Sequence, residues 1–313
     1  MTALSDLKAE YFDTAPPAPD RIGFTARLKA QATAGASALL LPMMRAIARD
    51  SIGGESLDDA WAVAQRLQTR GLAHTLGYWD TTQDTQADVT RIYVNAIARL
   101  GEASQDGYLS IKPPALRFDP AAAETLARTA ARAGVRLHCD SHGANVADHT
   151  FGFLRRLLRH LPAELVSVTL PGRWARSLED ATRMAELGVA VRIVKGEWPD
   201  APGLDRDLRQ GFLELVDRAA DLGLRNAVAT HDVELAEQSL RRLAAEGAPA
   251  ELEFIFGNQS NALIALADAQ EVTARAYVPY GRGFAPSALK ALRRNPRIAL
   301  DMLGHMAGLR RPS

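Results

Sequence analysis

Residues 189–198 read VAVRIVKGEW, an almost unbroken apolar run that contains Arg192 and ends in Lys195 and Gly196. A strand that is buried on both faces of a parallel sheet gives such a run. A buried charge needs a partner. The charges of Arg192 and Lys195 therefore have two interpretations, and this segment alone favours neither. They pair with carboxylates on neighbouring elements, or Lys195 and Gly196 approach an anion such as a phosphate or the edge of a flavin ring.

Similar short β-like runs recur along the chain at the length of one strand-plus-helix unit, about 30 residues. The eight expected strands are 72–78, 108–112, 134–140, 165–170, 189–194, 226–230, 252–256 and 274–279. Segments with helical periodicity lie between them, at 121–133, 178–187, 208–222, 234–246 and 261–271. Gly134, Gly188 and Gly223 follow three of these helices, where a C-cap glycine is expected. The alternation predicts a (β/α)8 barrel of the TIM type.

The part of the chain before the first expected strand has helical character. Its clearest amphipathic piece is 56–67, SLDDAWAVAQRL. We therefore predict an N-terminal helical segment over residues 1–70 and a barrel domain over 71–313 that includes the C-terminal helices, together forming one structural unit.

Composition limits the partners and the compartment. The 313 residues hold 37 Lys plus Arg and 37 Asp plus Glu, so no net charge attracts nucleic acid. The single Cys139 excludes an internal disulfide framework. No secretory signal is visible, and the longest apolar run, 36–44, is too short to span a bilayer. We expect a soluble cytoplasmic protein without an integral membrane segment.

In such a barrel the active site lies at the carboxyl ends of the strands. Seven expected strand ends carry polar or charged residues: Lys112; Asp140, Ser141 and His142; Arg173; Arg192 and Lys195; Thr230, His231 and Asp232; Asn258 and Gln259; Tyr277 and Tyr280. The group is rich in cations, which suits an anionic cofactor or substrate. Lys112 and Asp140 end neighbouring strands, so they are candidates for an ion pair that orients a substrate amine or simply closes the barrel.

A second chemistry uses the histidines. His138, Asp140 and His142 alternate along one strand and, with His231, have the side chains of a metal-dependent barrel hydrolase. The neighbouring cations Lys112, Arg192 and Lys195 oppose a metal ion, so we predict no metal site.

Six motifs, taken in order, resemble the proline dehydrogenase family of FAD-dependent barrel enzymes. They are SIKPPAL (110–116), CDSHG (139–143), VRIVKGEW (191–198), ATHD (229–232), LEFIF (252–256) and YVPYGRGF (277–284). The resemblance covers most of the chain and implies hydride transfer from the carbon beside an amine nitrogen to FAD, giving an imine. It identifies the chain as a divergent member of that family.

The resemblance also implies roles for individual residues. Lys112, Asp140 and Arg192 match catalytic positions, and Lys112 and Tyr277 match substrate contacts. The cofactor-binding positions are Ser141, Pro171, Arg192, Lys195, Gly196, Glu197, Thr230 and His231. Pro171 and Ile255 replace glutamines of the family, and Glu197 replaces an alanine.

The last motif departs further from the family pattern. Lys290 and Ala291 stand where the family has an arginine pair that clamps the proline carboxylate, and Ser287 replaces a tyrosine. Lysine does not reproduce bidentate guanidinium recognition. Arg294 lies one helical turn after Lys290 and offers a substitute charge. Lys290 and Arg294 are therefore the expected contacts of the substrate acid group.

The sequence thus predicts a flavoenzyme that binds FAD, oxidises L-proline or a related cyclic or secondary amine, and passes electrons to a quinone or another acceptor. Three alternatives remain open: oxidation of a bulkier amine in a specialised pathway, the metal-dependent hydrolase, and a barrel that has lost its cofactor and serves as a binding module.

Overall fold

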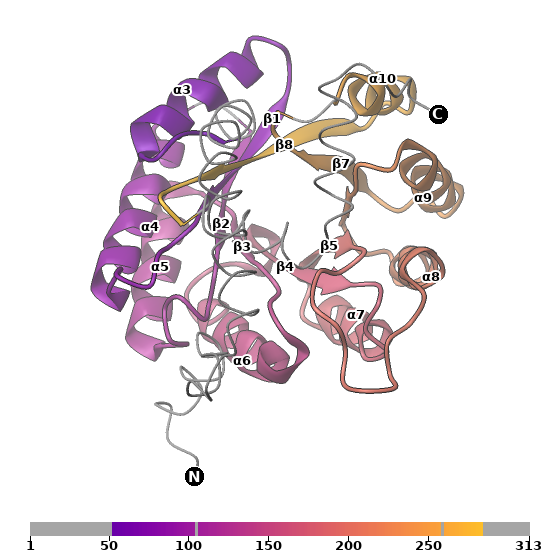
Figure 1. Cartoon of the computed structure of the whole chain (residues 1–313), viewed down its shortest axis with the longest axis horizontal. Coiled ribbons are helices and arrows are strands. Elements are labelled where there is room, and N and C mark those ends of the chain that lie inside the picture. Colours follow the sequence, from indigo (N-terminus) through magenta and orange to yellow (C-terminus); the bar gives the residue numbers. More distant parts are fainter. Residues whose placement is uncertain (1–51, 104–105, 258–259, 284–313) are drawn as a thin grey trace, which may run out of the picture.

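The computed structural model describes residues 52–103, 106–257 and 260–283. Eight parallel strands pair in chain order and close into a barrel, which helices surround (Figure 1). The strands are β1 (Ala73–Tyr78), β2 (Gly107–Ile111), β3 (Leu137–Cys139), β4 (Val166–Pro171), β5 (Ala190–Val194), β6 (Asn226–Ala229), β7 (Ala250–Ile255) and β8 (Thr273–Tyr280). This confirms the predicted (β/α)8 barrel.

The helices are α3 (Leu57–Gln68), α4 (Gln86–Gly101), α5 (Pro120–Ala133), α6 (Ala147–Leu157), α7 (Ser177–Glu186), α8 (Leu208–Asp221), α9 (Val233–Ala245) and α10 (Asn261–Ala269). Short 3-10 turns precede α6 (Ala144–Val146) and β4 (Ala163–Leu165). The ends of the α-helices follow from the local sequence. Ser56 and Asp59 form a capping box at the start of α3, and Thr85 and Asp88 form another at the start of α4. Gly134 closes α5 with a φ of 67°.

The expected third strand, 134–140, is longer than the observed one. Gly134 ends α5 in the left-handed region, and the amide of Val135 then donates to the carbonyl of Ala130, so these residues still belong to the helix end. β3 is left with residues 137–139. The other expected strands agree with the observed ones to within about two residues, the usual scatter of element ends.

The predicted N-terminal segment is described only in part. The helix expected at 56–67 is α3, which packs against β1 and β8. Residues 1–51 lie outside the described residues. None of the helices in the described part of the chain combines the length and apolar character that a membrane span needs.

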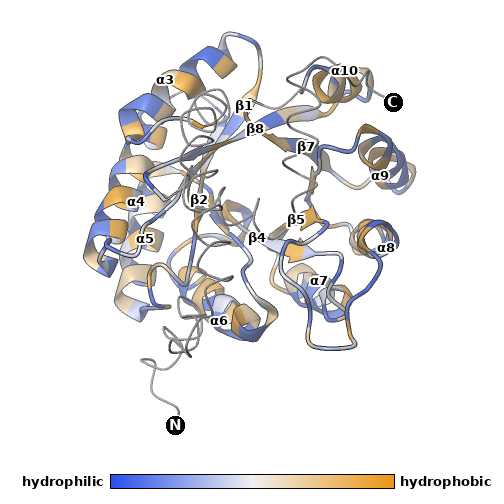
Figure 2. Cartoon of the chain, in the orientation of Figure 1, coloured by the Kyte–Doolittle hydropathy of each residue, from blue (hydrophilic) through white to orange (hydrophobic). Residues whose placement is uncertain are grey.

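Side chains alternate across the barrel wall. In β5, Val191 and Ile193 join the apolar cluster beneath the helices, whereas Arg192 bonds to side chains of β2, β3 and β7 across the interior. The helices turn apolar sides toward the sheet and polar sides outward (Figure 2), as the spacing of Phe212, Leu215 and Val216 in α8 illustrates. The apolar core therefore lies between sheet and helices, and the barrel interior is polar.

Two buried histidines make the stability of this fold sensitive to acid. Burial, and then repulsion from Arg275, lowers the pKa of His74 to about 4, and burial likewise lowers that of His142 to about 4. In the unfolded chain both take up a proton near pH ~6.5. The free energy of unfolding is therefore unaffected by them above that pH and falls as the pH drops from about 6.5 to about 4, by on the order of 3 kcal/mol for each.

Urea unfolding followed by circular dichroism between pH 7 and pH 5 measures this. His74→Leu should flatten the decline, because neither ring nitrogen of His74 has a hydrogen-bond partner and the charge penalty disappears with the ring. His149→Gln is the matched control, since His149 is exposed on α6. An unchanged decline in the His74 variant would contradict the assignment.

Candidate functional site

The centre of the barrel mouth is the guanidinium of Arg192. Its Nε and Nη2 donate to the two carboxylate oxygens of Glu253 at 2.8 and 2.9 Å, and its Nη1 donates to Asp140 at 2.8 Å. Arg192 is 5% exposed and Glu253 is 2% exposed. A planar guanidinium thus links β5 to β7 and β3 with charge-assisted bonds, the geometry that arginine favours.

Glu253 is fully satisfied by its neighbours. The hydroxyls of Thr75 on β1 and Tyr108 on β2 donate to its carboxylate at 3.0 and 2.9 Å, and Nη2 of Arg192 also reaches the Tyr108 oxygen at 3.0 Å. Four strands therefore meet at one carboxylate, which fixes the position of Arg192.

Asp140 lies next to Arg192 of the Arg192–Glu253 pair, directly after the end of β3. It accepts bonds from the hydroxyl of Ser110 at 2.7 Å and from that of Tyr277 at 3.3 Å, besides the bond from Arg192. The ring of Tyr277 also lies over the guanidinium, with 5.3 Å from its centroid to the Arg192 Cζ. Asp140, Arg192 and Tyr277, which the sequence predicted as site residues, thus come together.

The electrostatics favour a permanent charge on Arg192. Burial opposes the charged form, but Glu253, Tyr108 and Asp140 outweigh it and raise the pKa of Arg192 well above its usual value. Burial also opposes the charged form of Tyr277, which raises the pKa of this tyrosine, and the charge of Asp140 raises it further. Tyr277 therefore stays a hydroxyl donor at neutral pH.

Lys112 lies at the same mouth, directly after β2, but does not form the expected ion pair. Its Nζ donates to the carbonyl of Tyr78 and lies 5.0 Å from the centroid of the Trp79 ring. Asp140 bonds instead to Arg192. Burial lowers the pKa of Lys112, although Asp140 and Asp80 partly offset this. A lysine with a lowered pKa is better suited to accept a proton than an exposed one.

Gly77 makes room for Tyr277. A Cβ at Gly77 would lie 2.1 Å from the Tyr277 hydroxyl oxygen, closer than any real contact. The glycine in β1 is therefore required for the tyrosine to reach Asp140.

A second group of charges follows β5 and β6. The carboxylate of Asp232 accepts bonds from Lys195 and from Arg209, each at 3.0 Å. Gly196 has a φ of 103°, where glycine is favoured, and a Cβ there would lie 2.9 Å from Pro171 and Arg173. The positive φ and the close packing of Pro171 and Arg173 therefore both require glycine at this position.

Exposed apolar side chains occur along the same edge of the barrel. The large apolar residues exposed in the described part of the chain are Leu204, Leu208, Val233 and Ile255, at 53%, 44%, 40% and 45% exposure. All four lie at the carboxyl ends of β5, β6 and β7 or in the segments that follow. Exposed apolar groups gathered beside cations at an active-site edge suit a ligand with both ring systems and phosphates.

The remaining predicted positions lie at the same edge. Pro171 ends β4, Ser141 follows β3, and Glu197 lies in the loop after β5. Thr230 Oγ1 accepts a bond from the amide of Asp232 at 3.1 Å, and His231 Nε2 accepts one from the amide of Ile255 at 3.2 Å. Lys290 and Arg294 lie outside the described residues.

Within the described residues, His138, His142 and His231 belong to no cluster that could hold a metal ion. Both ring nitrogens of His138 are engaged, by Ser167 at 2.8 Å and by Thr169 at 2.7 Å. Over residues 52–103, 106–257 and 260–283, no group of three or more His, Cys, Asp or Glu side chains could hold a metal ion. Cys139 is buried in the core, as expected.

Sequence reasoning missed Glu253 and Tyr108 as parts of the site, and it named Asp232 only as a polar residue at a strand end. The signal for Glu253 was present: it is a carboxylate inside the apolar run LEFIF, where period-2 alternation turns it to the face opposite Leu252 and Phe254. Both of those neighbours belong to the apolar cluster. A carboxylate inside a buried strand needs a cationic partner. Arg192 is a suitable partner, because it likewise lies inside an apolar run, 189–194.

The chain matches no family model. Among curated proteins it is 26% identical over 272 residues to the proline dehydrogenase of Deinococcus radiodurans, covering 81% of this chain and 87% of that protein. It is 23% identical over 274 residues to proline dehydrogenase 1 of Bacillus subtilis subsp. natto, covering 82% and 89%. These two relatives support the resemblance seen in the motifs.

Solved structures share the fold. Proline utilization A from Bdellovibrio bacteriovorus superposes with a TM-score of 0.68 at 15% identity, covering 78% of this chain and 32% of that one. The protein of the same name from Corynebacterium freiburgense gives a TM-score of 0.64 at 15% identity, covering 90% and 33%. The chain therefore spans about a third of the length of these larger proteins.

The buried pair makes a testable statement about stability. Glu253→Gln leaves a neutral group beside the Arg192 charge, and breaking a buried ion pair from one side lowers the free energy of unfolding by about 3 kcal/mol. Urea unfolding at pH 7 measures the loss. Glu179→Gln removes one partner of an exposed pair with Arg183 and should lose under ~1 kcal/mol. Equal losses in the two variants would refute the central role of Glu253.

Proposed function

Because the chain is a divergent member of the proline dehydrogenase family, we propose that it is a flavoenzyme that oxidises L-proline to an imine with FAD as the hydride acceptor. The observation that carries the proposal is the meeting of Lys112, Asp140, Arg192 and Tyr277 at one barrel mouth. Catalytic residues of barrel enzymes come from the ends of several strands at this face.

The residues at the β5–β7 edge fit FAD. Lys195 and Arg209 provide positive charge for the diphosphate, and Thr230 and His231 lie beside them. Ser141, Pro171, Gly196 and Glu197 would lie along the ring system. The exposed side chains of Leu208, Val233 and Ile255 offer apolar surface. When bound, FAD supplies the two-electron acceptor that no side chain can provide.

The chain's own residues orient the amine and move its proton. The amine loses a proton from nitrogen and a hydride from the adjacent carbon, so that a C=N bond forms. Lys112, with its lowered pKa, would accept the proton, and Asp140 would hold the amine close to it. Tyr277 would pack over the substrate ring. Arg192 stays protonated, and it would stabilise the negative charge that the hydride acceptor gains.

The substrate carboxylate would meet Lys290, with Arg294 as a second charge, in the place of the family's arginine pair. The two electrons then leave to a quinone or another acceptor. The equal numbers of cationic and anionic residues give no reason to expect nucleic acid as a partner.

A spectrum tests the proposal directly. The purified full chain, incubated with FAD and freed of unbound cofactor, should keep the visible flavin band, and L-proline added without oxygen should bleach it. A protein that keeps no flavin under these conditions would refute the oxidoreductase function. A retained band that proline does not bleach would refute L-proline as the substrate.

Lys112→Met tests the proton acceptor. Removing a positioned base lowers kcat/KM for L-proline by about 10²- to 10⁴-fold. In the parent enzyme kcat/KM should rise with pH as Lys112 loses its proton, at a pH below the usual lysine range because burial lowers its pKa. The variant should lose this rise.

Arg91→Gln is the matched control for that experiment. Arg91 is exposed on α4, away from the barrel mouth, and its loss should leave both kcat/KM and the pH profile unchanged. A Lys112 variant with the parent pH profile would show that another group takes the proton.

Ala291→Arg tests the carboxylate contact. If Lys290 alone replaces the arginine pair, a restored guanidinium should lower KM for L-proline by about 10- to 150-fold, the effect of one charge-assisted hydrogen bond of about 1.5–3 kcal/mol. Ala291→Gln adds a similar length without charge and should leave KM nearly unchanged. Equal KM values in the two variants would contradict the proposed contact.

A further inference from the structure

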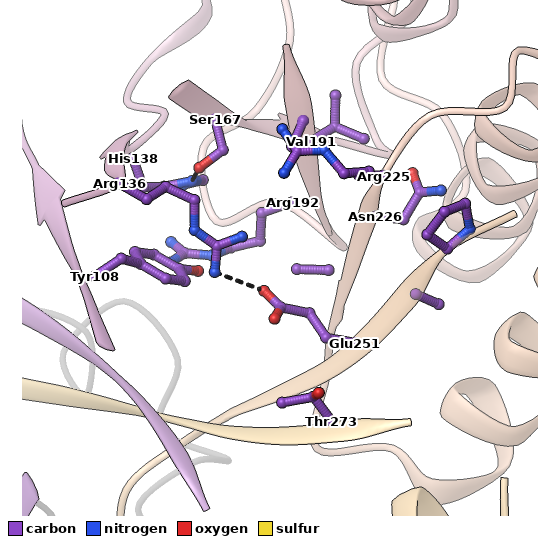
Figure 3. A pocket seen from close by; sticks show the side chains of 14 residues that line it. Tyr108, Arg136, His138, Ser167, Val191, Arg192, Arg225, Asn226, Glu251 and Thr273 are labelled. Carbon is purple, nitrogen blue, oxygen red and sulfur yellow. Dashed lines mark hydrogen bonds and ion pairs between the residues drawn. The ribbon is translucent and has the colours of Figure 1, made fainter. Parts of the chain in front are cut away.

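A second cavity lies at the opposite end of the barrel from the site described above. Ala190, Asn226, Ala250 and Thr273 are the first residues of β5, β6, β7 and β8, and all four line it. Its volume is about 150 Å³. Figure 3 shows Arg136, Arg225, Asn226 and Glu251 around this space, with His138 and Ser167 on one side. Active sites of such barrels use the other end, so these polar groups are not part of the proposed proline site.

The cavity has more positive than negative charge. Glu251 bonds to Arg275 at 2.8 Å and to Arg136 at 3.3 Å, so one carboxylate serves two arginines. Asp106, the second partner of Arg275, is 64% exposed and largely solvated. No Asp or Glu of the described residues lies within ion-pairing distance of Arg225, whose recorded bond runs to the main-chain carbonyl of Glu164 at 2.9 Å.

The two arginines Arg136 and Arg225 influence each other. Partial burial lowers the pKa of Arg225 and the charge of Arg136 lowers it further, while Glu164 and Glu251 partly offset this. Two guanidinium groups that repel each other across a hollow are stabilised by an anion between them.

A buried amide lines the same space. Asn226 is 4% exposed, and its side-chain Nδ2 donates to the carbonyl of Leu224. Because a carbonyl oxygen accepts this bond, the amide atom that forms it is Nδ2 and the other atom is Oδ1. Oδ1 has no hydrogen-bond partner. A buried polar atom without a partner is destabilising, so a ligand that supplies an N–H or O–H donor there gains affinity.

We propose that this lower cavity, formed by Arg136, Arg225, Asn226 and Glu251, binds a small amino acid as its zwitterion. The carboxylate would lie between the two guanidinium groups, and the ammonium would donate to Asn226 Oδ1 and face Glu251. Both charges of the ligand thus meet their opposites, and the unpartnered Asn226 Oδ1 receives a donor.

Other ligands match this set less well. A phosphate or sulfate ion offers no suitable donor to Asn226 Oδ1 when fully ionised and would face the Glu251 carboxylate. A simple amine or a metal cation would face three arginines. The volume is below the ~300–1,000 Å³ usual for drug-sized ligands, which excludes a nucleotide.

The proposed site is independent of proline oxidation. Tyr108 and Arg192 separate the lower cavity from the barrel mouth. Both line the cavity, and both bond to Glu253 of the site at the mouth. Glycine is a suitable probe, since it carries both charges and is not a cyclic or secondary amine.

Saturation-transfer NMR of the full, FAD-loaded chain titrated with glycine tests the proposal. Binding is expected with a Kd on the order of 1 mM. Acetate, which lacks the donor, and methylammonium, which lacks the carboxylate, should each bind at least about tenfold more weakly, because each loses one charge-assisted contact.

Two variants place the binding in the lower cavity. Arg225→Gln removes the unpaired cation, and Ala190→Met fills the space from another strand; each should weaken glycine binding at least about tenfold. Arg132→Gln, exposed on α5, is the matched control. A folded Arg225→Gln or Ala190→Met protein, as judged by circular dichroism, that binds glycine with parent affinity would overturn the proposal.

Binding at the upper site has its own signature. Glycine affinity that is lost in Lys112→Met but kept in Arg225→Gln would also overturn the proposal, because it would place glycine at the barrel mouth. Failure of L-proline to bleach the flavin leaves this test intact, since glycine binding is read without turnover.

Discussion

The burial of one positive charge constrains both the fold and the site. Arg192 lies inside the barrel at 5% exposure, where an unpaired guanidinium would be strongly destabilising. Glu253 and Asp140 neutralise it from β7 and β3. Because side chains alternate between the two faces of a strand, a slip of one residue in any of the three strands would turn a charge toward the apolar helices. The ion pairs and the apolar cluster therefore require the same register.

This requirement explains why the barrel is polar inside. Tyr108 is central to the arrangement: Arg136 lies 3.9 Å and Arg275 4.6 Å from its ring centroid, while its hydroxyl bonds to Glu253. The cations at the lower end thus pack on the ring, and the anion at the upper end bonds its oxygen. Each end has its own charge pairs, so a change in one pair is not expected to remove the other.

The fold was predictable because its signals are local. Apolar runs, helix periodicity and glycines such as Gly134 and Gly223 each act over a few residues. The partners in the site are not local. Glu253 is 61 positions from Arg192 and 178 from Thr75. Adjacency of β2 and β3 suggested that Lys112 would pair with Asp140, but the longer guanidinium of Arg192 reaches Asp140 from two strands away. The sequence indicated several residues of the mouth, such as Asp140, Arg192 and Tyr277, but it did not indicate which side chains bond to one another.

Two positions that depart from the family pattern, Pro171 and Ile255, both lie at the carboxyl-terminal edge of the barrel. Pro171 and Ile255 have no side-chain hydrogen-bond groups, and the side chain of Ile255 is 45% exposed. Its amide, however, donates to His231, which ties the loop after β6 to β7. This edge therefore offers charged groups and exposed apolar area, and no side-chain hydrogen bonds at Pro171 and Ile255. A cofactor held there depends more on burial of its rings and on Lys195 and Arg209 than on bonds to the ring atoms, and ionic strength should affect its affinity accordingly.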